Sequence, residues 1–233
     1  MISFIIPAHD EERLLAATLQ SIKAAADTVG EPFEVIVVDD ASTDGTAEVA
    51  REQGATVLSV EHRQISRTRN AGATVSNGEW LVFVDADTQI GPDVLGGAVA
   101  ALRGGAVGGG ARLEFEGTAP LVPRVLAAIF LPIYFGLRLA AGCFVFCTRE
   151  AFDEAGGFDP ELYASEEVTF SNELKKRGRF VILRNRVVTS GRKLRSHSVR
   201  EMIAPLGAMM LRGRKTFDRR EGLDLWYGAR RND

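Results

Sequence analysis

Short apolar runs alternate with segments of helical periodicity along the first hundred residues. The apolar runs predict strands over residues 2–7, 34–40, 55–60 and 79–84. Helical spacing and composition predict helices between these strands. The first begins after Asp10, the second runs from Ser42–Asp44 to Glu52, and the third covers residues 66–76. A fourth helix is predicted from Pro92 to Leu102. Strands and helices that alternate in this way form right-handed βαβ units. The sequence therefore predicts an α/β fold with a mostly parallel central sheet flanked by helices.

Acidic residues follow three of these predicted strands directly. In a parallel sheet the carboxyl ends of the strands share one edge, and ligands bind in the crevice outside that edge. We therefore expect a set of polar side chains to converge there: His9, Glu11, Asp39, Asp40, Asp85 and Asp87. Acids that converge on one cleft are typical of a functional site.

The pair Asp85 and Asp87 ends the most apolar run, L-V-F-V-D-A-D-T. If the segment is extended, side chains two apart point to the same side. Two carboxylates about 4 Å apart repel by roughly 4 kcal/mol at an effective dielectric near 20. A divalent cation with a preference for oxygen ligands, Mg²⁺ or Mn²⁺, would relieve that repulsion. The structural alternative is a polar strand end that leads into a turn.

The pattern changes after Gly104. The apolar stretch 121–141 is interrupted by Pro123 and Pro132 and by two arginines, which makes it a poor membrane-spanning helix. It predicts broken helical segments that cover the site, with contact to a membrane surface as the alternative. Further strands are predicted over residues 142–148, 180–183 and 186–189. Helices are predicted within 149–159, over 164–176 with Ser165 as the cap, and over 201–211. No repeat or linker interrupts the chain, so a single domain over residues 1–233 is expected.

Composition and charge narrow the function classes. Hydrophobic residues make up 45% of the chain and charged residues 25%, as in ordinary globular proteins. The first residues lack a basic segment typical of a signal peptide, and the two cysteines lack the partners for a zinc site, so a reduced, cytoplasmic protein is expected. Residues 1–60 contain eleven acids and three bases, whereas residues 175–215 contain thirteen bases and one acid. That basic segment suits phosphates or an anionic membrane face, and the absence of a nucleic-acid motif argues against nucleic acid.

Several motifs together resemble those of the family 2 glycosyltransferases, inverting enzymes with the GT-A fold. They are F-I-I-P-A-H-D-E-E, V-V-D-D-A-S-T-D-G-T, R-T-R-N-A-G, V-D-A-D-T, G-G-F-D and S-E-E-V-T-F-S-N-E-L-K-K-R-G. Their order and spacing cover residues 2–189, about four-fifths of the chain. The resemblance implies a nucleotide-binding half over residues 1–104 and an acceptor-binding half with a C-terminal tail over residues 105–233.

The resemblance also implies roles for individual residues on the donor side. Pro7, Ala8 and His9 would line the nucleobase and ribose, and Glu11 would bind one of the two. Asp40 would accept the imide hydrogen of uracil or its equivalent, with Asp39 in support. One of Arg69 and Asn70 would help to seat the nucleotide. Asp85 and Asp87, with Ala86 between them, would form the D-x-D pair, and Asp87 would be the more direct ligand of Mn²⁺ or Mg²⁺.

Two further roles concern the chemistry of transfer. A base must take the proton from the acceptor hydroxyl, and the resemblance places Glu167 in that position, with Glu166 left as an alternative. The structural reading of this pair is that acids in a first helical turn stabilise the helix dipole. Positive charge must offset the diphosphate leaving group. The candidates are Arg192, Lys193 and Arg195, with His197 as a further phosphate or metal contact.

We therefore expect a metal-dependent inverting glycosyltransferase. It would use a nucleotide sugar, with a UDP-sugar favoured over a GDP-sugar, and a glycan or lipid-linked acceptor. Peripheral contact with the inner face of a membrane is a further expectation. One alternative is a binding module that kept the nucleotide pocket and lost turnover, which would not need Glu166 and Glu167. The other is a sugar-1-phosphate nucleotidyltransferase, which the lack of glycine in P-A-H-D-E-E disfavours.

Overall fold

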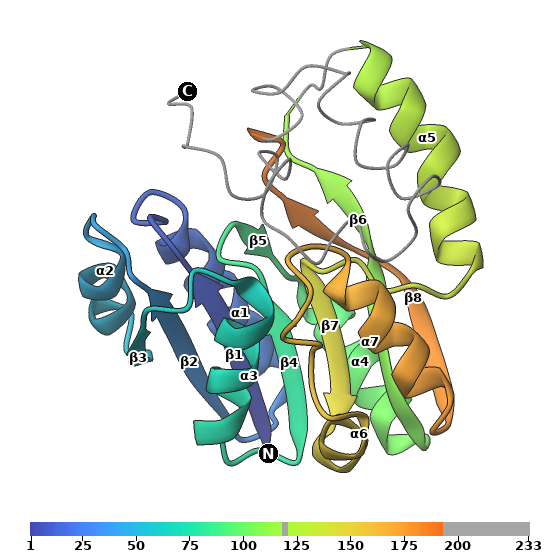
Figure 1. Ribbon diagram of the computed structural model, residues 1–233, viewed down its shortest axis with the longest axis horizontal. Helices are drawn as coiled ribbons and strands as arrows, with labels where there is room; N and C mark the ends of the chain where they lie inside the picture. Colours follow the sequence, from blue (N-terminus) through green and yellow to red (C-terminus); the bar gives the residue numbers. More distant parts are fainter. Residues whose placement is uncertain (118–120, 193–233) are drawn as a thin grey trace.

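An eight-stranded sheet forms the centre of the protein, with the strand order β3-β2-β1-β4-β7-β6-β8-β5 (Figure 1). The computed structural model describes residues 1–117 and 121–192. The sheet is mixed. Neighbours pair in parallel on the β3-β2-β1-β4 side, whereas β7 runs antiparallel to both β4 and β6. The α/β class predicted from the sequence is confirmed, and the parallel arrangement holds for the half that carries the acidic strand ends.

The first four strands lie close to their predicted positions. Their bounds are Ile2–Ala8 for β1, Phe33–Asp40 for β2, Thr56–Val60 for β3 and Trp80–Val84 for β4. Pro7 was expected to end β1, but the strand continues to Ala8, and Pro7 lies opposite Val38 of β2. On the other side β1 pairs with β4 only as far as Ile5. Pro7 therefore lies beyond that ladder, where a missing N–H group is tolerated.

Helices cover both faces of the sheet. Helices α1 (Leu15–Val29), α2 (Thr46–Glu52) and α4 (Pro92–Arg103) contribute to the core on one face. Helices α3 (Ile65–Val75), α6 (Arg149–Ala155) and α7 (Glu166–Lys175) contribute to the core on the other face. Pro92 occupies the first turn of α4, as predicted. The result is a three-layer arrangement in which the strand ends are left accessible at one edge.

Asp10 does not cap the first helix, contrary to the prediction. Helix α1 begins five residues later, and its N-cap residue is Leu14. Asp10 instead has a left-handed backbone, with φ of 51°, and its carboxylate accepts a hydrogen bond of 2.7 Å from the backbone N–H of Thr43. The acid that was expected to start α1 therefore joins the loop after β1 to the loop after β2.

The second half of the chain departs further from the predictions. A long strand β6 (Ala106–Phe115) was not predicted, and neither was the two-residue strand β5 (Thr88–Gln89). The predicted strands 180–183 and 186–189 form a single strand, β8 (Arg179–Thr189). Their separation reflects a real irregularity, because the register against β6 shifts between Ala111 and Arg112. Strand β7 (Phe144–Thr148) lies within its predicted range. The predicted helix 201–211 lies outside the described residues.

The run Gly108-Gly109-Gly110 lies inside β6, at its tightest packing. A Cβ atom on Gly109 would lie 2.1 Å from the carbonyl oxygen of Val181 and 2.5 Å from the ring of Phe146. Only glycine allows this approach between the strands and the aromatic ring. A glycine run usually indicates a loop, and for that reason the pattern did not predict β6.

Helix α5 (Leu121–Gly136) replaces the broken segments that were expected over residues 121–141. It is one helix with Pro132 inside it, and it lies apart from the two helix layers, at the upper right of Figure 1. No helix in the described part of the chain has the length and apolar character needed to cross a membrane. Val125, Ile133 and Leu137, in and just after α5, are exposed.

Candidate functional site

The carboxyl ends of β1, β2 and β4 meet at one edge of the sheet, as the sequence predicted. Strand β1 lies between the other two, and both neighbours run parallel to it. The three loops that carry the acidic residues therefore leave the sheet side by side. Most of these acids are partly or fully buried, so their charges must be offset by partners or ligands.

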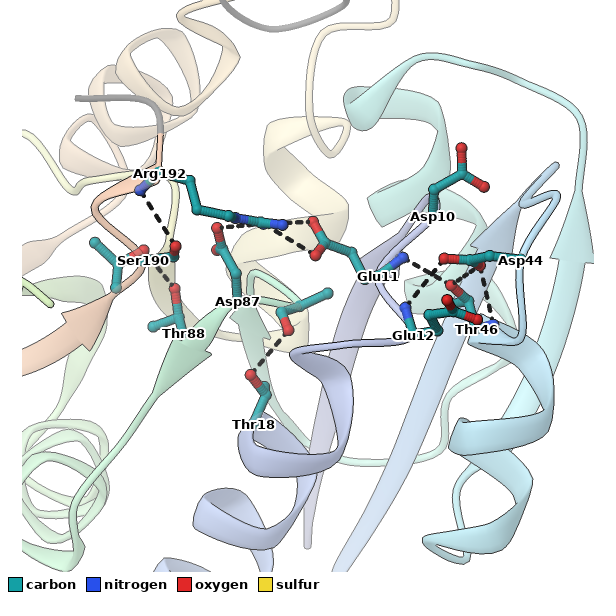
Figure 2. A network of polar contacts seen from close by, with 12 residues as sticks. Asp10, Glu11, Glu12, Thr18, Asp44, Thr46, Asp87, Thr88, Ser190 and Arg192 are labelled. Carbon is teal, nitrogen blue, oxygen red and sulfur yellow. Dashed lines mark hydrogen bonds and ion pairs between the residues drawn. The ribbon is translucent and has the colours of Figure 1, made fainter. Parts of the chain in front are cut away.

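The loops after β1 and β2 are fastened together by their polar side chains (Figure 2). The N–H group of Glu11 donates to Thr46 Oγ1 over 2.7 Å, and that hydroxyl donates to the carboxylate of Asp44. In the other direction, Gly45 N–H donates to Glu12 Oε2 over 2.8 Å. These bonds hold the backbone of Glu11 in place and thereby position the start of its side chain.

Asp40 and Asp39 are both buried, but they differ in how many donors they bind. The carboxylate of Asp40 accepts hydrogen bonds from the N–H groups of Arg63 and Gln64, at 2.7 and 3.2 Å, and from the hydroxyl of Thr68 at 2.7 Å. Asp39 accepts one long bond of 3.3 Å from Ser42 N–H. Asp40 thus holds the start of α3 in addition to any contact with a nucleobase. Its predicted role toward uracil stays a prediction.

The other predicted nucleotide contacts lie on the same edge. Ala8 is buried at the end of β1, and Pro7 is partly exposed. The His9 side chain is about half exposed, and its Nδ1 atom lies 2.8 Å from the carbonyl oxygen of Asp40. That bond holds the imidazole over the ends of β1 and β2. The three residues are placed where a base and ribose could rest, and their roles stay predictions.

Arg69 is a buried arginine that joins three segments of the site. Its Nη1 atom donates to Glu166 Oε1 over 2.6 Å, and its Nη2 atom donates to Asp85 Oδ1 over 2.8 Å and to the carbonyl oxygen of Gly142 over 2.9 Å. Its side chain is 1% exposed, and its guanidinium carbon lies 5.1 Å from the ring centre of Phe158. Arg69 therefore contacts the acids themselves, and the predicted contact with a nucleotide stays untested.

Asn70 forms hydrogen bonds to the backbone of Phe158 with both the nitrogen and the oxygen of its side-chain amide. Its Nδ2 atom donates to the carbonyl oxygen over 2.8 Å, and its Oδ1 atom accepts from the N–H group over 2.9 Å. Gln64 and Ser66 donate to the carbonyl oxygen of Leu162. The start of α3 thus holds the loop before α7. The sequence analysis did not single out Gln64 and Ser66, because a buried polar side chain cannot be told from an exposed one in the sequence.

Asp85 and Asp87 do not lie on an extended segment, contrary to the prediction. Strand β4 ends at Val84, and the chain turns so that Thr88 N–H bonds to the carbonyl oxygen of Asp85 over 3.0 Å. The carboxylate of Asp85 contacts Arg69, whereas that of Asp87 contacts Arg192. The repulsion between two acids is therefore relieved by two different arginines.

Glu166 and Glu167 open α7, as predicted, but their surroundings differ. Ser165 occupies the N-cap position without a side-chain cap bond. Glu166 is buried and held by Arg69. Burial raises the pKa of Glu167 to about 8, and the neighbouring charge of Glu166 adds to this. Glu167 lies beside Gly142, and its side chain is partly exposed. The pair thus consists of one carboxylate held by an arginine and one whose pKa is raised by burial.

Tyr134, at the end of α5, lies close to this acidic pair. Its hydroxyl donates to the carbonyl oxygen of Ala140 over 2.8 Å. Burial raises the pKa of Tyr134, and the charges of Glu167 and Glu166 raise it further. The sequence analysis treated this stretch as cover for the site and did not identify the tyrosine, which no motif marks.

Arg192, the last described residue, lies between two acids. Its Nη2 atom contacts both oxygens of Glu11, at 3.0 and 2.9 Å, and Asp87 Oδ2 at 3.0 Å (Figure 2). These charges raise the pKa of the guanidinium, although burial acts in the opposite direction. Lys193, Arg195 and His197, the other candidates for the diphosphate and the metal, lie outside the described residues.

Comparisons with known proteins decide the family. Residues 3–156, about two-thirds of the chain, match the family described as Glycosyl transferase family 2. This chain belongs to that family. The region matched includes the ends of β1, β2 and β4 and stops before Glu166. The resemblance stated from the motifs is thereby confirmed.

Curated relatives match part of this family 2 glycosyltransferase. An undecaprenyl-phosphate 4-deoxy-4-formamido-L-arabinose transferase of Aeromonas hydrophila is 32% identical over 116 residues, which are 45% of this chain and 34% of the relative. A 4,4'-diaponeurosporenoate glycosyltransferase of Staphylococcus haemolyticus is 38% identical over 96 residues, 38% of this chain and 24% of the relative. The matched part is thus about a third or less of each relative.

Solved structures share the fold. A mannosyltransferase of Pyrobaculum calidifontis, in complex with GDP-Man and Mn²⁺, has a TM-score of 0.67 and 22% identity over 90% of this chain and 61% of that one. TarS of S. aureus, in complex with UDP-GlcNAc, has a TM-score of 0.64 and 21% identity over 89% of this chain and 65% of that one. These matches confirm the GT-A fold.

The carboxylates of Asp87 and Glu11 fit a divalent cation by their chemistry. Both already bind one positively charged nitrogen, and carboxylate oxygens are ligands that Mg²⁺ and Mn²⁺ prefer. Within the described residues, no group of three or more His, Cys, Asp or Glu side chains is placed to hold a metal ion. Two carboxylates suffice where phosphate oxygens and water complete the coordination, as is common for Mg²⁺.

Arg69 should be essential for the stability of this family 2 fold. We expect Arg69→Met to lower the free energy of unfolding by about 3 kcal/mol or more, because it removes the buried cation that pairs with Glu166 and Asp85. Arg69→Lys should lose less, since it keeps a charge but not the fork of donors. Urea denaturation measures both changes.

The matched control is Arg103→Met. Arg103 forms an ion pair with Glu31, but its side chain is 64% exposed, so its loss should change the free energy of unfolding by about 1 kcal/mol or less. Similar, small losses for Arg69→Met and Arg103→Met would contradict a central role for the buried arginine.

Proposed function

We propose that this family 2 glycosyltransferase moves a sugar from a nucleotide donor to an acceptor hydroxyl with inversion and with the help of a divalent cation. One observation carries the proposal: Arg69 binds Asp85 and Glu166 with the same guanidinium group. Asp85 belongs to the acids expected at the donor, and Glu166 belongs to the acidic pair expected at the acceptor. One arginine side chain therefore contacts both groups of acids. That spacing suits a direct displacement between two bound substrates.

Glu167 is the residue we propose as the base. Glu166 is buried and forms an ion pair of 2.6 Å with Arg69, so its carboxylate already has a partner. Glu167 has a pKa of about 8, close to the working range of a general base. A base of this kind would accept the proton of the acceptor hydroxyl as its oxygen attacks the sugar.

The donor side is proposed from the strand ends. Pro7, Ala8 and His9 would line the base and ribose, Asp40 would accept a hydrogen bond from the base, and Glu11 would lie near the ribose and the diphosphate. Arg192 would offset charge on the diphosphate, and a cation held by Asp87 with the help of Glu11 would supply further electrostatic stabilisation of the leaving group. The complexes of neighbours with UDP, UDP-GlcNAc and GDP-Man support a nucleotide-sugar donor, and we favour a UDP-sugar.

The role of Glu167 is tested by the pH dependence of turnover. Below pH 8 the carboxyl group is mostly protonated and cannot act as a base, so kcat/KM should rise about tenfold per pH unit up to about pH 8 and then level off. Glu167→Gln should lower kcat by roughly a hundredfold or more and leave the Kd for the nucleotide unchanged. Steady-state kinetics with a panel of UDP- and GDP-sugars provide the measurement.

Glu173→Gln is the matched control on the same helix, because Glu173 pairs with Lys176 and Arg177 on the surface. It should keep the wild-type kcat and pH profile. A flat profile between pH 6 and 9, or a Glu167→Gln variant with normal turnover, would contradict the assignment of the base. Nucleotide binding without any turnover in the wild type would favour the binding-module alternative.

A lipid-linked acceptor and contact with the inner face of a membrane form a further part of the proposal. The name of one relative includes undecaprenyl phosphate. Exposed Val125, Ile133 and Leu137 on and beside α5 could insert into a membrane surface, and exposed arginines at 124 and 138 could contact anionic headgroups.

Flotation with anionic liposomes tests this contact. We expect the wild type to float at low salt and the variant Ile133→Glu/Leu137→Glu to remain in the dense fraction, because the charges remove the apolar surface. Val75→Glu, which changes an exposed apolar residue on α3, is the control and should float like the wild type. Equal flotation of all three proteins, or none for the wild type, would contradict a role for α5.

A further inference from the structure

Arg192 occupies the position between Glu11 and Asp87 at which a cation would be expected. One nitrogen atom, Nη2, lies within 3.0 Å of three carboxylate oxygens from these two acids. The side chains of Glu11 and Asp87 are 10% and 17% exposed, whereas that of Arg192 is 32% exposed. Figure 2 shows the guanidinium group reaching across from the end of β8 to both acids.

Hydrogen bonds hold the backbones of the two acids, and the arginine reaches them with a long side chain. Asp87 lies just before β5, which pairs with β8, and its carbonyl oxygen accepts a bond of 3.1 Å from Ser190 N–H. Glu11 is held through Thr46. Arg192, in contrast, follows the end of β8 and reaches the acids with the full length of a flexible side chain.

We propose that Arg192 is an internal counter-ion that competes with the divalent cation for Asp87 and Glu11. The inference rests on the proposed function, since it concerns the same acids. Either a guanidinium group or a metal ion can neutralise the two carboxylates, but two cations at one position repel each other. Occupation of the acids by Arg192 therefore weakens the binding of a metal ion that arrives alone.

A nucleoside diphosphate changes this balance. Its phosphate oxygens give Arg192 a second anionic partner, because two oxygens of one phosphate can accept hydrogen bonds from a planar guanidinium group. Asp87 and Glu11 are then free to hold the cation together with the phosphates. Metal and nucleotide should consequently bind with positive coupling, and Arg192 is the residue that couples them.

The test measures the binding of Mn²⁺ in the absence of nucleotide. The electron paramagnetic resonance signal of free Mn²⁺ reports how much of the ion is unbound. Without nucleotide, Arg192→Gln should bind Mn²⁺ about tenfold more tightly than the wild type, because the competing charge is gone. Arg192→Lys, which keeps one charge as an ammonium group on a different stem, should lie between them. Thermal melts confirm that each variant is folded.

Arg186→Gln is the matched control, because Arg186 also belongs to β8 but forms an exposed pair with Glu114 at 3.5 Å. It should bind Mn²⁺ like the wild type. Addition of UDP should tighten Mn²⁺ binding in the wild type and in Arg186→Gln, and should tighten it much less in Arg192→Gln.

Equal or weaker Mn²⁺ binding by Arg192→Gln, compared with the wild type, would overturn the inference. Failure of the proposed function has a different signature in the same titration: UDP would not alter Mn²⁺ binding by the wild type at all. Tighter Mn²⁺ binding by Arg192→Gln would still support the counter-ion in that case.

Discussion

Carboxylates converge on one edge of the sheet, and their mutual repulsion is the constraint that the rest of the site has to satisfy. Two carboxylates about 4 Å apart repel by roughly 4 kcal/mol near the surface of a protein. Two arginines relieve that repulsion in different ways. Arg69 is fully buried and joins Asp85 to Glu166, whereas Arg192 is partly exposed and joins Glu11 to Asp87. The first pairing is part of the core, and we propose that the second exchanges its partners when ligands bind.

This division separates a buried part of the site from a part that we propose responds to ligands. The loop before α7 is fixed to α3 by Gln64, Ser66 and Asn70, and Arg69 extends the same attachment to the acids. Glu167 is thereby held in position while its burial keeps its pKa near 8. On the side proposed for the donor, Arg192 is partly exposed, and we propose that a diphosphate and a cation change its contacts. In this proposal the fold positions the base, and the ligands complete the donor site.

The sequence predicted the arrangement of the acids much better than their individual partners. Apolar runs that end in acids indicated parallel strands with a shared edge, since strand direction follows from the βαβ pattern. The meeting of Arg192 with Glu11 depends on β5, whose two residues carry no periodicity, and on its pairing with β8. Strand β6 was missed because close packing against Val181 and Phe146 requires the glycines that normally indicate a loop. Asp10 resembled a helix cap, but a loop 33 residues away uses its carboxylate.

The most direct test of a metal-dependent donor site is calorimetric titration of UDP and GDP, with and without Mn²⁺, into the wild type and Asp87→Ala. Asp87 is the proposed ligand of the cation and touches no part of the core pairing made by Arg69. We predict that the wild type binds one of the two nucleotides in a Mn²⁺-dependent manner and that Asp87→Ala loses most of this affinity. Binding of neither nucleotide, or binding that is unchanged in Asp87→Ala, would contradict the account.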